Sequence, residues 1–260
     1  MRVGVCQLES KLDAFDENLD KVVAGLERAA RDRVELLAFP ENFLTGFADN
    51  EALARRSAFA VDSPQMMALL DRTMQFDTTF VVGFNELRGP DFYNTAAVVY
   101  KGHLLGTYSK CTAYFPFEKQ GREFPVFECG GVKFGVVICS DGGYIEPTRI
   151  LALKGAQVIL APHYNTIAPK GLIGHFMHVR ADHTARAVEN NVYFVRANSV
   201  AIGKEAGLTK GEGVGYGDSY IVDPGGEIVI HSRRHVEDFF FADLDLTVAN
   251  RYRGNHRSLF

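Results

Sequence analysis

Residues 133–149 read KFGVVICSDGGYIEPTR and join an apolar run to a tight turn and then to a helical pattern. Residues 134–138 form the short β-branched and aromatic run typical of a buried strand. The sequence SDGG at residues 140–143 cannot easily continue that strand. Cys139 therefore stands at the end of a predicted strand. A thiol at that point faces the crevice beyond the strand ends, close to backbone N–H groups that can stabilise an oxyanion.

A purely structural role is the alternative interpretation of Cys139, because free cysteine is among the most buried residue types. The chain has four cysteines, which are too few and too widely spaced for a disulfide scaffold, and no CxxC pair indicates zinc. We expect free thiols, no metal and no cofactor. Cys6 lies in an apolar run and reads as core, and Cys111 lacks the strand-then-glycine turn that follows Cys139.

The composition is that of an ordinary globular protein, with 47% hydrophobic and 23% charged residues among 260. Its 28 basic and 32 acidic residues give a formal net charge of −4, and the basic residues are scattered. No nucleic-acid footprint or polybasic membrane patch is therefore indicated. Because the chain also shows no signal-peptide pattern and no run of membrane-spanning length, we expect a cytoplasmic protein with neither nucleic acid nor membrane as partner.

The N-terminal part of the chain alternates strand and helix patterns. Residues 3–8 and 36–39 read as strands, and apolar spacing over 16–33 predicts a helix between them. Pro40 ends the second strand and Glu41 follows it directly. Taken alone, a carboxylate at this position fits a helix cap or a surface group.

The next elements are predicted to be a helical stretch, a strand and a turn-rich connector: residues 50–76, 80–84 and 85–91. Residues 95–110 read as a hairpin with a tight turn at Lys101-Gly102, and Lys110 ends its second arm. Residues 111–128 are rich in aromatic residues, proline and glycine, which predicts an irregular loop of the kind that lines sites.

Beyond the Cys139 turn, helix and strand patterns alternate again: residues 147–154, 157–162, 175–191 and 192–200. The glycine-rich residues 201–217 predict a loop, residues 217–230 a hairpin with a Pro-Gly-Gly turn, and residues 239–246 a closing strand. Alternation with hairpins in the gaps indicates a mixed α/β sheet system with helices on its outer faces.

Three ionisable residues stand at predicted strand ends in FPENFLTGF, YSKCTAYFPFE and GVVICSDGGYIEPTR: Glu41, Lys110 and Cys139. Their order and contexts resemble the nitrilase superfamily of carbon–nitrogen hydrolases, which uses a Glu-Lys-Cys triad. ALKGAQVILAP, ARAVENNVYFVRAN and YGDSYIVDPGGEIV extend the resemblance over essentially the whole chain. It implies a single carbon–nitrogen hydrolase domain over residues 1–260, folded as a four-layer α-β-β-α sandwich with two mixed sheets, and a homodimer or higher homo-oligomer.

The resemblance also implies roles for these residues. Glu41 would be the general base and acid, Lys110 with the backbone N–H after Cys139 would bind the oxyanion, and Cys139 would carry a thioester. Glu118, in FEKQGREF, looks like the additional glutamate that many members place beside the triad, either holding Lys110 or positioning the substrate nitrogen and water. Taken singly, Lys110 and Glu118 fit surface residues better, and only the joint pattern favours catalysis.

Substrate binding is less specifically indicated. The candidates follow the Cys139 turn or the strand predicted next to it: Tyr144, His163, Tyr164 and Asn165. A structural role for His163 is an equally good interpretation. The expected substrate is a small linear amide or an N-carbamoyl compound, with a nitrilase acting on a small nitrile, or a catalytically silent scaffold or binding protein, as alternatives. The Ser140-Asp141-Gly142-Gly143 turn is smaller than the aromatic version in many members, so substrate choice does not transfer from the family.

Overall fold

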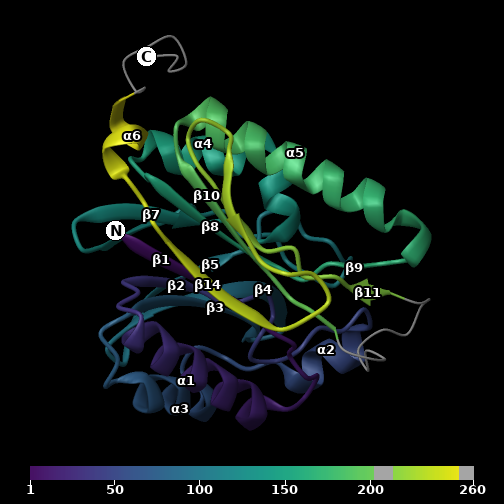
Figure 1. Ribbon diagram of the computed structural model, residues 1–260. Helices are drawn as coiled ribbons and strands as arrows, with labels where there is room; N and C mark the ends of the chain where they lie inside the picture. Colours follow the sequence, from purple (N-terminus) through teal and green to yellow (C-terminus); the bar gives the residue numbers. More distant parts are fainter. Residues whose placement is uncertain (202–212, 252–260) are drawn as a thin grey trace.

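The computed structural model describes residues 1–201 and 213–251, and within them two six-stranded mixed sheets lie face to face (Figure 1). The first sheet has the order β14 (Asp238–Asp243), β1 (Arg2–Gln7), β2 (Leu36–Ala38), β3 (Thr79–Arg88), β4 (Asp91–Tyr100) and β5 (His103–Ser109). The second has the order β13 (Ile228–His231), β12 (Tyr220–Val222), β10 (Tyr193–Asn198), β8 (Val158–His163), β7 (Val132–Val136) and β6 (Val126–Cys129).

Each sheet has parallel strands at its centre and antiparallel strands at its edges. β1, β2 and β3 are parallel, as are β7, β8 and β10, and the hairpin strands add antiparallel pairs on either side. A separate short pair joins β9 (Thr166–Ile167) to β11 (Val214–Gly215). Parallel neighbours need crossover helices, and these helices supply the outer layers.

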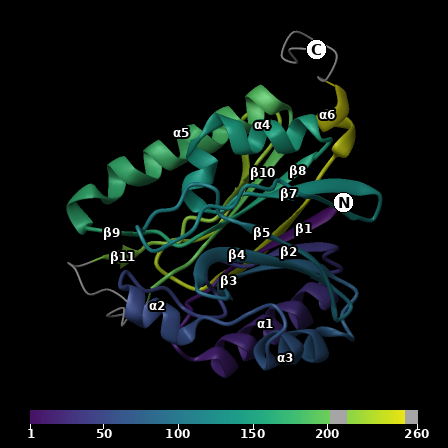
Figure 2. The same cartoon turned by 180° about the vertical axis from the view of Figure 1, so that it is seen from behind.

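The outer faces of the two sheets are covered by different helices (Figures 1 and 2). α1 (Phe15–Arg31) and α3 (Pro64–Thr73) cover the first sheet, and α4 (Ile145–Leu153) and α5 (Leu172–Asn190) cover the second. The short helices are α2 (Glu51–Ser57), α6 (Leu246–Arg251) and the 3₁₀ turns at Cys139–Gly143 and Pro169–Gly171. The expected four-layer α-β-β-α sandwich is therefore confirmed.

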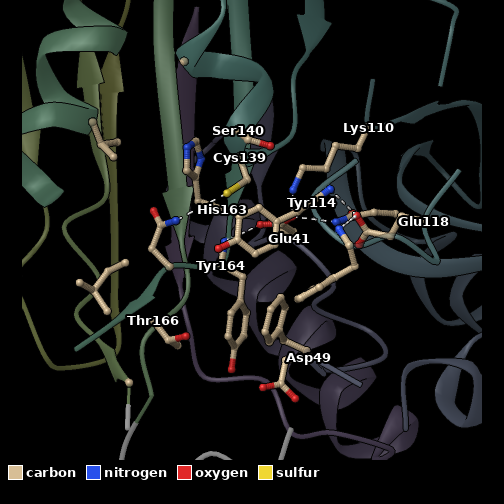
Figure 3. Close-up of a pocket in the computed structure, with 18 of the residues that line it drawn as sticks. Glu41, Asp49, Lys110, Tyr114, Glu118, Cys139, Ser140, His163, Tyr164 and Thr166 are labelled. Carbon is tan, nitrogen blue, oxygen red and sulfur yellow. Dashed lines mark hydrogen bonds and ion pairs between the residues drawn. The ribbon is translucent and has the colours of Figure 1, made fainter. Parts of the chain in front are cut away.

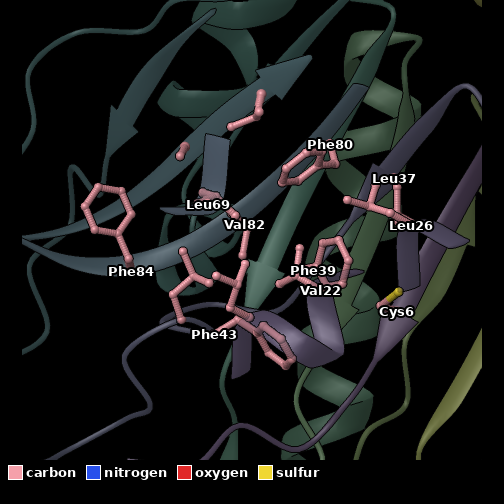
Figure 4. Close-up of a cluster of buried hydrophobic side chains, with 14 of the residues drawn as sticks. Cys6, Val22, Leu26, Leu37, Phe39, Phe43, Leu69, Phe80, Val82 and Phe84 are labelled. Atoms are coloured by element: carbon pink, nitrogen blue, oxygen red, sulfur yellow. The ribbon is translucent and has the colours of Figure 1, made fainter. Parts of the chain in front are cut away.

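The layers follow from the two-residue repeat of the strands. Leu36 and Ala38 of β2 pack between the two sheets, whereas Leu37 and the following Phe39 pack under the helices α1 and α3 (Figure 4). Both faces of such a central strand are buried, so its sequence is apolar throughout rather than alternating. A third cluster lies between the second sheet and its helices and includes Val137, Leu151 and Phe194.

Several predicted boundaries are wrong. The helical stretch predicted over 50–76 is two helices, α2 and α3, and residues 214–215 of the predicted loop pair with β9 as β11. Residues 85–91 are not a connector, because β3 continues to Arg88 and β4 begins at Asp91. The polar residues there are satisfied inside the sheet: Glu86 accepts a hydrogen bond from Thr95 on β4 at 2.7 Å. The end of the predicted loop 111–128 is also regular, because residues from Val126 onward pair as β6 with β7.

Part of the glycine-rich segment predicted as a loop, residues 202–212, lies outside the described residues. Within residues 1–201 and 213–251, no helix combines the length and the apolar character that crossing a membrane requires.

Candidate active site

Glu41 is placed by a turn that packs closely on β3. A Cβ atom at Gly83 of β3 would lie 2.4 Å from the Asn42 backbone nitrogen, so only glycine allows this approach. The Gly83 N–H donates to the Pro40 carbonyl at 3.3 Å, and its own carbonyl accepts the Leu44 N–H at 3.0 Å. The Glu41 N–H itself donates to the His163 carbonyl of β8 at 3.3 Å, so both sheets fix the backbone of Glu41 as it leaves β2.

The Glu41 side chain is buried and fully hydrogen-bonded. Its Oε1 accepts from Lys110 Nζ at 2.9 Å and from Asn94 Nδ2 at 2.7 Å, and its Oε2 accepts the Tyr164 backbone N–H at 2.8 Å. The exposed fractions of the Glu41 and Lys110 side chains are 2% and 4%. A buried ion pair of this kind needs hydrogen bonds to its remaining lone pairs, and Asn94 and Tyr164 provide them.

Lys110 is held just past the end of β5. Its backbone N–H donates to the Asn94 carbonyl at 2.9 Å, which places both side chains on the same side of Glu41. Burial opposes the charged ammonium, but the negative charge of Glu41, supported by Cys139 and Glu118, outweighs burial and raises the pKa of Lys110. Lys110 is therefore a cation at neutral pH.

Cys139 occupies a sharp elbow between β7 and α4. Its φ of +50° lies in the left-handed region, which costs a non-glycine residue free energy and is typical of functional turns. Five residues separate Cys139 from α4, and Gly142 among them lies close under α5: a Cβ there would meet His183 Nε2 at 3.0 Å. The small SDGG turn thus lets α5 approach the elbow.

Asp141 ties the Cys139 elbow to the segment after Lys110. Its carboxylate is fully buried and accepts the Ile138 N–H at 3.1 Å, the Tyr108 hydroxyl at 2.7 Å and the Thr112 N–H at 2.8 Å. Cys111 Sγ donates to the same carboxylate at 3.2 Å. One side chain therefore sets the separation between the strand end that carries Lys110 and the one that carries Cys139.

The thiol of Cys139 lies close enough to Glu41 and Lys110 for both charges to act on it (Figure 3). Burial, followed by the negative charge of Glu41, raises its pKa to about 12, and Lys110 only partly offsets that rise. The thiol is therefore neutral near pH 7. Burial and the charge of Asp141 likewise raise the pKa of Cys111 to about 12, so Cys111 has no advantage as a nucleophile.

Glu118 lies at the wall of the same cavity, in the loop before β6 (Figure 3). Its Oε2 accepts the backbone N–H groups of Tyr114 at 2.8 Å and Phe115 at 3.2 Å. Burial raises the pKa of Glu118, while the positive charge of Lys110 opposes the rise. Glu118 is thus near Lys110 and is anchored by its own loop.

A cavity of about 1100 Å³ opens beside these groups. All eight residues predicted for the site line it: Glu41, Lys110, Glu118, Cys139, Tyr144, His163, Tyr164 and Asn165. Tyr144 is exposed at its rim, whereas the other three substrate-binding candidates are buried. The Tyr164 ring stacks on Phe47, with centroids 4.5 Å apart, and Asn165 Nδ2 donates to Cys139 Sγ at 3.5 Å.

His163 and His183 form a buried pair behind Cys139, with ring centroids 4.9 Å apart. His163 Nδ1 lies 2.8 Å from the Ala161 carbonyl, which can only accept, so this nitrogen carries the proton. His183 Nδ1 bonds the Tyr220 hydroxyl at 2.8 Å. Burial, with the positive charge of Arg196 nearby, holds the pKa of each histidine well below its usual range, so both rings are neutral.

Sequence reasoning missed two residues that contact the site. Asn94 lies in β4 and bonds Glu41, and Arg196 lies in β10 and bonds Asn165 at 2.6 Å. Arg196 had a signal, since it is a charged residue inside the apolar run VYFVRANSV. Asn94 had none, because it falls between the predicted connector 85–91 and the predicted hairpin 95–110 and belongs to neither.

Comparison with known proteins identifies the family of the chain. The sequence matches the family model described as "Carbon-nitrogen hydrolase" over residues 2–254. The (R)-stereoselective amidase of a Pseudomonas species is 31% identical over 256 residues, which cover 96% of this chain and 88% of that protein. The glutamine-dependent NAD(+) synthetase of Thermotoga maritima is 32% identical over 256 residues, but they cover 95% of this chain and only 42% of the longer protein.

A solved structure shows the same architecture. A mutant of the Nesterenkonia AN1 amidase from the nitrilase superfamily superimposes with a TM-score of 0.77 at 25% identity, covering 98% of this chain and 94% of the other. The resemblance inferred from the sequence is thus confirmed, and the chain belongs to the carbon-nitrogen hydrolase family within the nitrilase superfamily.

Proposed function

We propose that the chain is an amidase that cleaves a small linear amide, or an N-carbamoyl compound, through a thioester on Cys139 and without a cofactor. The observation that carries this proposal is the buried Glu41–Lys110 ion pair beside a thiol whose pKa is raised to about 12. So weak an acid needs a base to remove its proton, and Glu41 lies close enough to act on it. The similarity to an (R)-stereoselective amidase supports the same reaction class.

In the first half of the reaction, Glu41 takes the Cys139 proton while the sulfur attacks the amide carbonyl carbon. The carbonyl oxygen becomes an oxyanion that accepts hydrogen bonds from the Lys110 ammonium and the Ser140 backbone N–H. When the tetrahedral intermediate collapses, the C–N bond breaks and Glu41 returns the proton to the leaving amine. The acyl group stays on Cys139 as a thioester.

In the second half, Glu41 takes a proton from water while the water oxygen attacks the thioester carbonyl. The same two donors hold the oxyanion. The C–S bond then breaks, the electron pair goes to sulfur, and Glu41 returns the proton to Cys139. The product is a carboxylic acid, or a carbamic acid if the substrate carried a carbamoyl group.

Glu118 acts through Lys110 in this scheme. Its carboxylate is held by the backbone of Tyr114 and Phe115, and its negative charge is among the causes that raise the pKa of Lys110. Glu118→Gln should therefore lower kcat and leave KM almost unchanged. A large rise in KM with kcat preserved would instead indicate that Glu118 contacts the substrate.

The test is a panel of small amides, N-carbamoyl compounds, esters and nitriles, with mass spectrometry of the protein and assays for ammonia, amine and acid. An acyl adduct is expected on Cys139 and should vanish in Cys139→Ala. Cys111→Ala is the matched control, because its thiol lies in the neighbouring loop, and it should retain the adduct. Adducts confined to Cys6 or Cys111 would refute the assigned nucleophile.

The same panel separates the alternatives. Turnover of nitriles with no turnover of amides would identify a nitrilase, and neither adduct nor product with any compound would favour a silent scaffold. Glu41→Gln, shown by circular dichroism to be folded, should lose amide turnover by roughly 100- to 10,000-fold. Unchanged activity in that variant would remove Glu41 as the base.

Glutamine belongs in the panel as a second candidate substrate. It is favoured by the Thermotoga maritima relative, a glutamine-dependent enzyme of which this chain spans 42%. Release of ammonia and glutamate would support it, whereas turnover of other amides with glutamine untouched would exclude it.

Homodimerisation through α4 and α5 completes the proposal. Large apolar side chains are exposed on these helices and just before them: Tyr144, Ile145, Leu153, Ile173 and Met177. Contiguous exposed apolar residues mark interaction surfaces. Replacing Ile173 and Met177 by glutamate should shift sedimentation to the monomer, while Met67→Glu, an equally exposed change on α3, should not. A wild-type monomer at micromolar concentration would refute the dimer.

A further inference from the structure

Arg196 is a fully buried cation in β10, next to the candidate active site. Its Nη1 donates to the backbone carbonyls of Gly217 and Asp218. Its Nη2 donates to the Tyr216 hydroxyl at 3.0 Å and to the Asn165 side-chain oxygen at 2.6 Å. Burying a charge is costly, and Arg196 Nε finds no hydrogen-bond partner among the described residues, so a guanidinium at this point suggests a task that an apolar side chain could not perform.

The hydrogen bond from Arg196 decides which way the Asn165 amide points. A guanidinium has donors and no acceptor, so the amide oxygen has to face it. The amide nitrogen then points away from Arg196 and donates to Cys139 Sγ at 3.5 Å. The Asn165 backbone is held as well, because its N–H donates to Asn198 Oδ1 at 3.0 Å. Two residues of β10, Arg196 and Asn198, therefore fix both the backbone position of Asn165 and the orientation of its side-chain amide.

A hydrogen-bond donor aimed at Sγ has a use at two moments of thioester chemistry. Negative charge develops on sulfur when its proton leaves for Glu41, and again when the C–S bond of the thioester breaks. Lys110 and the Ser140 N–H are assigned to the oxyanion, so a separate donor is needed for the sulfur. A preorganised donor stabilises such charge without reorganisation during the reaction.

We propose that Arg196 is a positioning residue that holds the Asn165 oxygen, so that the Asn165 N–H stabilises charge on the Cys139 sulfur during attack and during thioester hydrolysis. The proposal rests on the cysteine mechanism above. It gives Asn165 a catalytic contact with the nucleophile in place of the substrate-binding role expected from the sequence. Arg196 itself touches neither substrate nor sulfur.

Alkylation of Cys139 by iodoacetamide tests the proposal without requiring any substrate. The rate, followed by mass spectrometry between pH 6 and 10 in a Cys111→Ala background, reports how readily charge forms on the sulfur. The titratable groups that face this sulfur are Glu41 and Lys110, with Tyr216 and the buried His163 nearby, and no variant below replaces any of the four.

Asn165→Asp is the sharpest variant. Its carboxylate also bonds Arg196 but turns an acceptor toward the sulfur, so it should slow alkylation by about tenfold or more and shift the pH profile upward. Asn165→Ala, which removes the donor without adding a repulsive group, should have a smaller effect in the same direction. If both variants alkylate as fast as the parent protein at every pH, the donor role is refuted.

Arg196→Met should slow alkylation much as Asn165→Ala does, and the double variant should be no slower than Asn165→Ala alone. A further slowing in the double variant would show that Arg196 acts by another route and would overturn the coupling. Arg180→Met is the matched control, because Arg180 bonds the Asp218 carboxylate at 2.6 Å from the side of α5 and does not contact Asn165. It should leave alkylation unchanged.

The outcome is independent of whether the chain proves to be an amidase. If no compound in the substrate panel is turned over, the alkylation profiles still decide the role of Asn165 and Arg196. If amides are turned over and Asn165→Asp neither slows alkylation nor lowers kcat, the positioning role fails while the amidase stands. Should Arg196→Met not fold by circular dichroism, the two Asn165 variants alone can refute the proposal.

Discussion

Lys110 Nζ lies 2.9 Å from Glu41 Oε1, and the exposed fractions of the two side chains are 4% and 2%. Removing one member of a buried ion pair leaves the other charge without compensation, which typically costs roughly 3 to 5 kcal/mol of folding free energy. The pair is also placed beside the Cys139 thiol, so its loss should affect chemistry and stability together.

Lys110→Met should lower kcat by about 100- to 1000-fold and also lower the free energy of unfolding. The first effect follows from losing an oxyanion donor and the second from leaving Glu41 unpaired. Lys101→Met is the control, because Lys101 pairs with Asp77 on the surface at 3.0 Å. Steady-state kinetics and urea unfolding measure the two effects, and a Lys110→Met enzyme with kcat within threefold of the parent would contradict the oxyanion role.

Cys139 should be a neutral thiol in the resting protein. Burial and the charge of Glu41 raise its pKa to about 12, so the thiolate should appear only in strongly alkaline solution. The difference in thiolate absorbance near 240 nm between the parent and Cys139→Ala measures this directly. An inflection below pH 8.5 in that difference would indicate a preformed thiolate and would make a general base unnecessary.

Asp141→Asn should weaken the link between the Cys139 elbow and the loop after Lys110. The amide cannot accept all the hydrogen bonds that the buried carboxylate receives from Tyr108, Thr112 and Ile138. We expect a loss of roughly 2 to 3 kcal/mol in unfolding free energy and at least a tenfold fall in kcat.

The matched control for Asp141 is Asp223→Asn. Asp223 also accepts two backbone N–H groups, from Gly225 and Glu227, but does so in an exposed turn. Asp223→Asn should change neither the free energy of unfolding nor kcat by much. Equal effects at the two positions would show that Asp141 has no special relation to the site.

The buried histidines predict how stability depends on pH. Burial lowers the pKa of His163 and His183 in the folded protein, so the unfolded chain binds more protons once the pH falls below about 6.5. Their contribution to stability is therefore present above that pH and is lost as the solution is acidified.

Replacing one of these histidines should flatten that pH dependence. Comparing unfolding free energies between pH 5 and 7.5, His183→Gln should reduce the slope by about 1.4 kcal/mol per pH unit. His103→Gln, at an exposed position after the β4–β5 turn, should leave the slope as it is. A His183→Gln slope equal to that of the parent would mean that His183 does not gain a proton on unfolding.

The fold and the strand ends that carry Glu41, Lys110 and Cys139 could be predicted because their signals are local. An apolar run stopped by proline or by a glycine turn identifies a strand end wherever it occurs. The family resemblance then connected the three ends. Their catalytic roles remain predictions, although the structure brings the side chains to one cavity.

Contacts between residues distant in the chain had no such signal. Asn94 and Glu41 are 53 residues apart, and Arg196 and Asn165 are 31 apart, so only the packing of strands decides that each pair meets. Polar residues inside strands were also interpreted as loop, because their partners in the adjacent strand are invisible in the sequence. This explains the wrong connector at residues 85–91.

The two sheets divide the candidate site between them. Glu41 and Lys110 follow strands of the first sheet, and Cys139 and Asn165 follow strands of the second. The Tyr164 N–H bonds Glu41 Oε2 at 2.8 Å across this boundary. Neither half of the chain contains both the thiol and the proposed base, so on the proposed mechanism a reactive centre can arise during folding only after the halves have docked, and a partly folded chain carries a thiol without Glu41 beside it.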